Sequence, residues 1–334
     1  MPTPADHTLD GDTTAFAGIR PGRIARIRGA CEDLALWLQD VVRMGGVELQ
    51  RQDDSFWSSI RTHLVDMQAP GLAHRLQDIE ALLRSTTSWE QALARELGRL
   101  YLLVQAWRRW ERLDIAWQAE LLQQAGAGIR REQVLVEAGI AGGWLVLGSR
   151  TEVRPYLNIR RTWVRHLEGQ EMALLLEFAP GTQSFDPGYA PGDCLRATLH
   201  YYPAPYPLRG LLADPVAESA GLPAATGYPL DAALEGYARA LAANPFIATY
   251  PLAVEGLLPL TVAALRCVRS GICLPLHPRF QGQWELYALA GGRPLAVFGE
   301  WDGLSFFPLG ARFGDTWVAV GGWTGSKHTG TADT

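Results

Sequence analysis

The hydrophobic pattern of this 334-residue chain changes its period near Gly139, and this change constrains the architecture more than any other feature. Before it, apolar residues recur at spacings of three and four, which is typical of helices that bury one stripe. After it, apolar and polar residues alternate and turn signals follow at short intervals, which is typical of strands. We therefore predict the α+β class, with an N-terminal all-α domain followed by a β-rich, mostly antiparallel domain.

The first part predicts a series of capped helices. One spans 22–44 and ends at Gly45, a second follows a cap at Asp54 or Ser55, and a third has Pro70 in its first turn. The string 87–90 (TSWE) fits a capping box that opens the longest helix. The other predicted ranges are about 56–67, 70–83 and 115–125.

The second part of the chain has the pattern of β-strands. Two pairs of these strands are predicted to form hairpins, with turns at Gly291-Gly292 and Asp302-Gly303, dipeptides that supply the positive φ of a tight turn. The predicted strands are 144–152, 157–168, 172–179, 194–202, 284–290, 294–301, 304–309 and 316–321, with loops at 180–193 and 214–228. The expected organisation is a flexible lead-in (1–19), a helical domain (20–135), a β-rich domain (136–323) with an inserted helix near 230–243, and a flexible tail (324–334).

The charge and the cysteine content of the chain indicate which cellular compartment and which classes of binding partner to expect. The net charge is −5, and 29 of the 30 basic residues are arginines scattered over both parts, which disfavours a nucleic-acid groove or an anionic membrane surface. The longest uncharged stretch, 240–254, is broken by two prolines, and the N-terminus lacks a signal peptide's basic start. Four dispersed cysteines make no disulfide framework. We expect a cytoplasmic protein with reduced thiols.

The strand 157–168 carries the first group of candidate binding residues. Alternation places Arg161, Trp163 and Arg165 on one face and Arg160 on the other. Such a face could bind phosphate, nucleic acid or a partner's carboxylates. The alternative is a solvated face whose arginines pair with Glu152, Glu168 or Glu177.

A second group is His200, Tyr206 and Arg209, among prolines, where either a ligand contact or the packing of a rigid turn explains the aromatic residues. Glu300 and Asp302 could be the paired carboxylates of a hydrolase, although turn chemistry explains them equally well.

Metal and cofactor motifs are weak. Cys267, Cys273 and His277 have ligand-like spacing but need a fourth ligand, for which Cys194 and His200 are the candidates, and buried thiols are the simpler interpretation. The glycine-rich strings lack phosphate-loop spacing, so no cofactor is predicted.

Several strings together resemble a known family. They are 34–42 (LALWLQDVV), 66–73 (DMQAPGLA), 161–163 (RTW), 206–209 (YPLR), 244–246 (NPF) and 297–303 (VFGEWDG). In this order they are similar to the region that follows the zinc finger in bacterial SWIM zinc finger family proteins. The resemblance implies an interaction component, associated with MoxR-type AAA+ ATPases and von Willebrand factor A domain proteins.

The chain contains neither the C-x-C nor the C-x-H pair that a SWIM finger needs, so the finger's zinc and DNA-binding properties do not transfer. The leading hypothesis is a non-catalytic scaffold or adaptor. The alternatives are a nucleic-acid-binding module that uses the strand 157–168, and an undescribed enzyme with its site in the β-rich domain.

Overall fold

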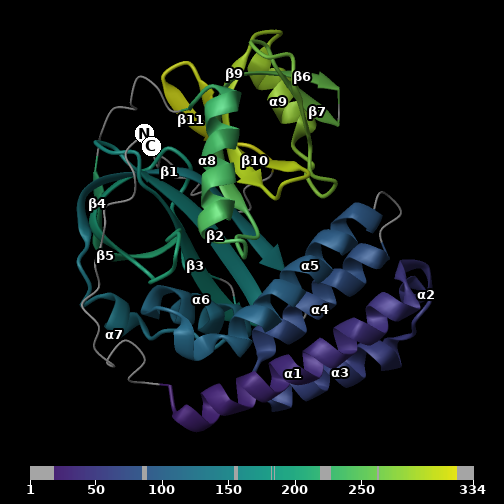
Figure 1. The fold of residues 1–334 in the computed structure, drawn as a ribbon. Coiled ribbons are helices and arrows are strands. Elements are labelled where there is room, and N and C mark those ends of the chain that lie inside the picture. Colours follow the sequence, from purple (N-terminus) through teal and green to yellow (C-terminus); the bar gives the residue numbers. More distant parts are fainter. Residues whose placement is uncertain are drawn as a thin grey trace. The chain divides into compact units, whose positions relative to one another are not determined.

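The structure is a computed structural model that describes residues 19–84, 89–153, 157–181, 183, 185–218, 227–261 and 263–321 (Figure 1). The chain divides into two compact units. One contains residues 1–134 with Pro203–Pro205, and the other contains Leu135–Tyr202 and the residues from Tyr206 on. The predicted lead-in up to residue 18, the tail 324–334 and the capping-box residues 87 and 88 lie outside the described residues.

The first unit is helical. In chain order its α-helices are α1 (Pro21–Met44), α2 (Gly46–Gln50), α3 (Asp54–Asp66), α4 (Pro70–Leu83), α5 (Trp89–Arg108), α6 (Ile115–Ala125) and α7 (Arg131–Val134). α1 buries Ile27, Cys31, Leu34, Leu38 and Val41, the stripe that the spacing predicts. α1 packs against α5, and α4 packs against α3, α5 and α6.

Most of the predicted helix ends are confirmed. α1 stops at Met44 before Gly45, whose φ of 83° suits glycine, and Pro70 occupies the first turn of α4. None of the helices within the described ranges combines the length and apolar character needed to cross a bilayer. The short helix α2 was not predicted.

The predicted cap of α3 is wrong by one or two positions. Asp53, not Asp54 or Ser55, is the N-cap, because its carboxylate accepts hydrogen bonds from the Ser55 hydroxyl (2.7 Å) and the Phe56 backbone N–H (3.1 Å). These two donors, the Ser55 hydroxyl foremost, lower the pKa of Asp53. Three consecutive residues with capping oxygens make the position ambiguous in sequence, and only the backbone geometry decides it.

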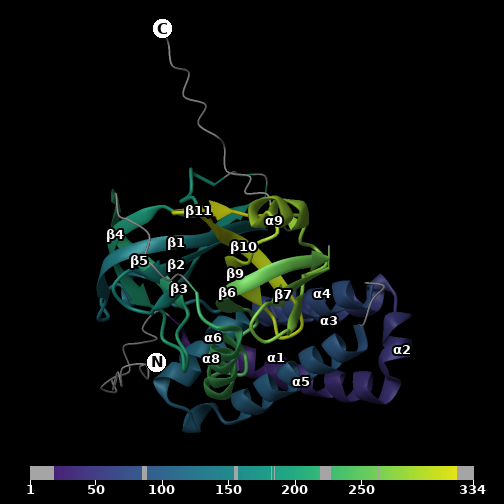
Figure 2. The same ribbon diagram turned by 90° about the horizontal axis from the view of Figure 1, so that it is seen from above.

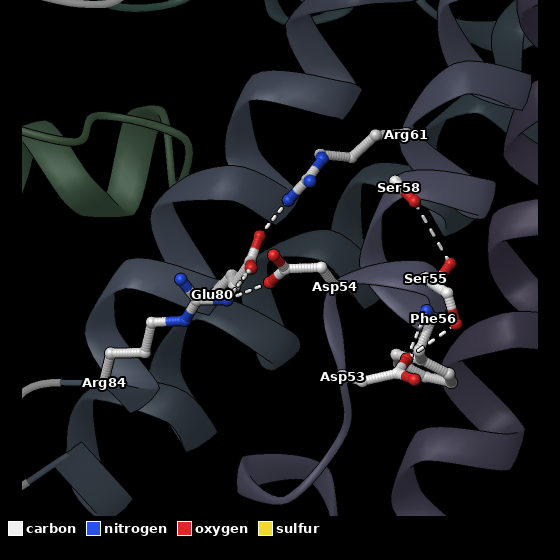
Figure 3. A network of polar contacts seen from close by, with 8 residues as sticks. All are labelled: Asp53, Asp54, Ser55, Phe56, Ser58, Arg61, Glu80 and Arg84. Atoms are coloured by element: carbon white, nitrogen blue, oxygen red, sulfur yellow. Dashed lines mark hydrogen bonds and ion pairs between the residues drawn. The ribbon is translucent and has the colours of Figure 1, made fainter.

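A buried carboxylate links α3 to α4 (Figure 3). Glu80 on α4 accepts hydrogen bonds from Arg61 on α3 and, at 2.6 Å, from Arg84 one turn along its own helix. Arg84 also pairs with Asp54 at the start of α3. Since an ionised carboxylate is stable in the interior only with such partners, this network fixes how the two helices pair.

The second unit contains a closed barrel of five strands, whose order is β1 (Ile140–Val153), β2 (Leu157–His166), β3 (Met172–Pro180), β5 (Arg209–Glu218) and β4 (Cys194–Tyr201). Figure 2 shows these strands curling round one another. Neighbours are antiparallel except β3 and β5, which are parallel. Side chains such as Trp144, Val146, Val164 and Leu199 fill the interior.

The second unit also contains a six-stranded sheet, in the order β11 (Thr316–Ala319), β10 (Phe306–Phe313), β9 (Leu295–Trp301), β6 (Tyr250–Thr261), β7 (Ala264–Cys267) and β8 (Cys273–Pro275). The helices α8 (Leu230–Ala243) and α9 (Gln283–Ala290) pack on β6. α8 occupies the range predicted for an inserted helix.

The barrel and the sheet share a core. Leu145 and Leu147 of β1 and Trp163 of β2 pack with Phe298 and Trp317 from the sheet, and the Trp317 indole N–H donates to the Leu147 carbonyl at 2.7 Å. Strand β9 therefore runs beside the barrel wall that carries the predicted binding strand.

Three predictions for the second unit are wrong. Residues 284–290 form the helix α9 instead of a strand, and Gly291 ends this helix in a left-handed conformation instead of making a hairpin turn. β5 continues through residues 214–218, which were predicted as loop, with Asp214 at a φ of 48°. The hairpin at Asp302-Gly303 is confirmed.

Candidate interaction site

The predicted binding strand β2 turns two of its candidates toward a buried carboxylate. Arg161 Nε and Trp163 Nε1 both donate to Glu300 Oε1, at 2.7 and 2.9 Å, and Arg150 Nε from β1 donates to Glu300 Oε2 at 2.7 Å. Arg161 and Trp163 thus share one face, as alternation predicts. They bind a group of their own unit.

The charge of Glu300 is stable despite its burial. The residue is 2% exposed, and burial by itself would raise the pKa of its carboxyl. The guanidinium groups of Arg161 and Arg150, together with the Trp163 N–H, outweigh that effect and hold the pKa to about 2. Glu300 is therefore an ionised internal link between the barrel and the sheet.

The other two arginines of β2 also have contacts within the unit. Arg160 pairs with Glu177 of β3, donates to the Asp186 carbonyl at 2.6 Å and lies over the Phe185 ring at 4.8 Å. Arg165 lies over the Tyr228 ring at 5.7 Å. The pairing with Glu177 is the alternative that the sequence left open.

The second predicted group does not form one cluster. His200 Nδ1 lies 2.8 Å from the Glu137 carbonyl, and Arg209 lies over the Tyr202 ring at 4.0 Å. Tyr206 lies beside Tyr250, with ring centroids 6.4 Å apart. Burial lowers the pKa of the Arg209 guanidinium group.

The remaining candidates do not form the predicted sites either. Cys267 is buried and Cys273 is exposed, while His277 packs against Phe307, and within the described ranges no three His, Cys, Asp or Glu side chains gather as metal ligands. The weak metal hypothesis for these residues is therefore not supported by their positions, and Cys194 is buried elsewhere, in the core that the barrel shares with the sheet. Asp302 accepts the Leu304 and Ser305 N–H groups of its turn, at 2.7 and 2.8 Å, and so serves the hairpin.

The helical unit carries a basic surface that the sequence did not reveal. Four arginines, Arg20, Arg23, Arg26 and Arg130, line an open hollow of about 630 Å³, which we call the arginine hollow. Its eight lining residues include no Asp or Glu. Within the part of the chain that the structure describes, none of the four guanidinium groups has a carboxylate partner.

Three segments build this hollow. The start of α1 provides Arg20, Arg23 and Arg26, the α3–α4 junction provides Val65, Gln68 and Pro70, and the segment before α7 provides Arg130. A signal for the first segment exists, since Arg23 and Arg26 are three residues apart in α1 and are therefore neighbours on one face of the helix. Only the fold shows that Gln68 and Arg130 join them.

Comparison with known proteins gives a family match for the helical unit. Residues 22–125 match the family model of the SWIM-associated four-helix bundle domain. No curated protein and no solved structure matches the chain. The match runs from the first turn of α1 to the end of α6 and agrees with the resemblance to the region that follows the finger in SWIM proteins. Residues 22–125 of this protein are therefore similar to the SWIM-associated four-helix bundle domain, and most of the residues that line the arginine hollow lie in this range.

Proposed function

We propose that this protein is a non-catalytic adaptor or scaffold that binds another protein through its SWIM-associated helical domain. The observation that carries the proposal is the arginine hollow, where four guanidinium groups line a concave surface without a carboxylate among the lining residues. A partner of opposite charge lowers the electrostatic free energy of such a surface and is steered toward it.

The resemblance suggests the kind of partner. SWIM family proteins of this type are associated with MoxR-type AAA+ ATPases and von Willebrand factor A domain proteins, and we propose a member of such a system as the partner. The match of residues 22–125 to the SWIM-associated domain supports the resemblance from which this choice of partner is taken.

We do not propose that β2 binds nucleic acid. Arg160 and Arg161 already bind Glu177 and Glu300, and Arg165 lies over Tyr228, so phosphate groups would have to displace internal partners. The enzyme hypothesis has no specific support either, because Glu300 and Asp302 serve an internal ion cluster and a turn.

Affinity purification of the full chain from its native host tests the proposal. We expect a stoichiometric partner under gentle conditions, and we expect a variant with Arg23→Glu and Arg26→Glu to lose it. Arg43→Glu is the matched control, because Arg43 is an exposed arginine at the far end of the same helix. Recovery of the chain alone would contradict the proposal.

A further inference from the structure

The arginine hollow concentrates positive charge on a fixed frame. Arg23 on α1 donates from Nη2 to the Gly126 carbonyl at 3.3 Å, which ties its guanidinium group to the end of α6. Its Nε is shielded from solvent but has no hydrogen-bond acceptor. Because Arg23 lines the hollow, the accessible N–H groups of its guanidinium group can donate to an incoming oxyanion.

The α3–α4 junction, which contributes Gln68 and Pro70 to the hollow, is closely packed. Pro70 and Gly71 begin α4 directly against the end of α6, so closely that a Cβ on Gly71 would come within 3.0 Å of backbone atoms of Gln124, Ala125 and Gly126. Gln68, which lines the hollow, has a φ of 61°, a left-handed conformation that is strained for a residue other than glycine. Such a frame holds the surrounding groups in place before a ligand binds.

The direction of α1 adds to the charge. The helix begins at the hollow, so the positive end of a 24-residue helix lies beside the guanidinium groups. Residues 20–131 contain 16 arginines and 14 acidic residues, so the helical unit as a whole is close to charge balance, whereas the lining of the hollow has four arginines and no acidic residue. A nucleic-acid backbone needs a longer basic track than this.

The hollow also has an apolar side. Val65 is 51% exposed, and Val65 and Pro70 line the hollow together with the arginines. A free phosphate has no apolar part that uses such a wall, whereas a peptide that mixes acidic and apolar residues contacts both. The arrangement of donors and apolar surface therefore favours a peptide ligand.

We propose that the arginine hollow binds a short, extended, Asp- and Glu-rich segment of a protein partner, with its carboxylates on the arginines and an apolar side chain against Val65 and Pro70. This inference rests on the proposed function, because it names the part of the partner that docks.

Fluorescence anisotropy with the full chain tests it directly. The probe is a labelled, acetylated peptide Asp-Glu-Leu-Asp-Glu-Asp, and its amidated analogue with Asn and Gln is the ligand control. We expect saturable binding of the acidic peptide that weakens with salt, and no binding of the analogue. Arg23→Glu with Arg26→Glu should weaken binding roughly tenfold or more, whereas Arg43→Glu should leave it unchanged.

A second variant distinguishes a loss of binding from a loss of folding. Arg20→Gln with Arg130→Gln changes two exposed side chains of the hollow, and it should also weaken the peptide while thermal unfolding stays as in the wild type. Equal affinity of all variants for the peptide would overturn the inference. So would displacement of the peptide by inorganic phosphate or by single-stranded DNA at lower concentration than by unlabelled peptide.

The two proposals fail separately. If the peptide binds at the hollow but purification recovers no partner, the acidic-ligand site stands and the adaptor role fails. If a partner is recovered equally by the wild type and by the Arg23→Glu, Arg26→Glu variant, and the peptide does not bind, the adaptor role stands and the assignment to the hollow fails.

Discussion

Arg150 and Arg161 lie directly opposite each other on the neighbouring strands β1 and β2, a position where two like charges repel. Glu300 from β9 binds both, with one carboxylate oxygen at 2.7 Å from each Nε. The three side chains therefore form a single charged unit in which the carboxylate compensates the repulsion between the arginines.

Removal of that carboxylate charge should destabilise the protein strongly. We expect Glu300→Gln to lower the free energy of unfolding by about 3–5 kcal/mol, because it leaves two partly buried arginines without a counter-charge. Chemical denaturation followed by tryptophan fluorescence measures the change. The matched control is Glu177→Gln, whose pair with Arg160 is half-exposed on the Glu177 side and should contribute about 1 kcal/mol or less. Equal effects of the two variants would contradict the assignment.

The ion cluster of Glu300 with Arg150 and Arg161 predicts that the stability of the protein depends on pH. The pKa of Glu300 is about 2 in the folded protein against an ordinary value of 4.5, so its stabilising contribution is complete above pH 4.5 and is lost as the pH falls toward 2. Melting temperatures of the wild type and of Glu300→Gln, measured across this window, should converge at the acidic end. A constant difference between the two would refute the link to Glu300.

Two glycines of the helical unit should respond in opposite directions to alanine. Gly71→Ala places a methyl group against the backbone at the end of α6, so we expect a clear loss of stability, by about 1–3 kcal/mol, from forced displacement of packed elements. Gly98 lies within α5 with open space around it, so Gly98→Ala should stabilise by about 0.5–1 kcal/mol through helix propensity. Thermal unfolding by circular dichroism distinguishes the two signs.

Thiol chemistry should separate the four cysteines. Cys273 is exposed, whereas Cys31, Cys194 and Cys267 are buried, and burial together with the nearby Glu32 raises the pKa of Cys31 to about 12. We expect one thiol to react with a soluble disulfide reagent in the folded protein and the other three only after unfolding. Cys273→Ser should abolish the reaction in the folded state. Labelling of that variant without denaturant would show that a second thiol is accessible.

Local signals predicted the helical unit well, because its helices carry their own boundaries. Gly45 after α1, Pro70 at the start of α4 and the apolar spacing of α6 all act within a few residues. In the β-rich unit, residues 284–290 are predicted as a strand because they are rich in aromatic and apolar side chains, whereas they belong to the helix α9, which buries Leu286 and Ala290. The closure of the barrel depends on the parallel pairing of β3 with β5, which no short pattern encodes.

For the candidate sites too, the sequence predicts what depends on near neighbours along the chain and not what depends on distant residues. Alternation placed Arg161 and Trp163 on one face correctly, but their partner Glu300 lies 139 and 137 positions away, so the sequence could not show that they bind it. In the arginine hollow, the contributors Arg23 and Arg130 are separated by most of the helical unit. Charge excess at a site depends on which neighbours fold beside it, and this information is absent from composition.

The position of Glu300 also has a consequence for how the strands align. In β9 it lies opposite Pro251 of β6 and Phe307 of β10. A shift of β9 by a single residue would turn the carboxylate to the other face and leave Arg150 and Arg161 without it. Misaligned versions of the sheet therefore carry an electrostatic penalty that the native alignment does not, and Glu300 selects among alternative folds as well as holding one together.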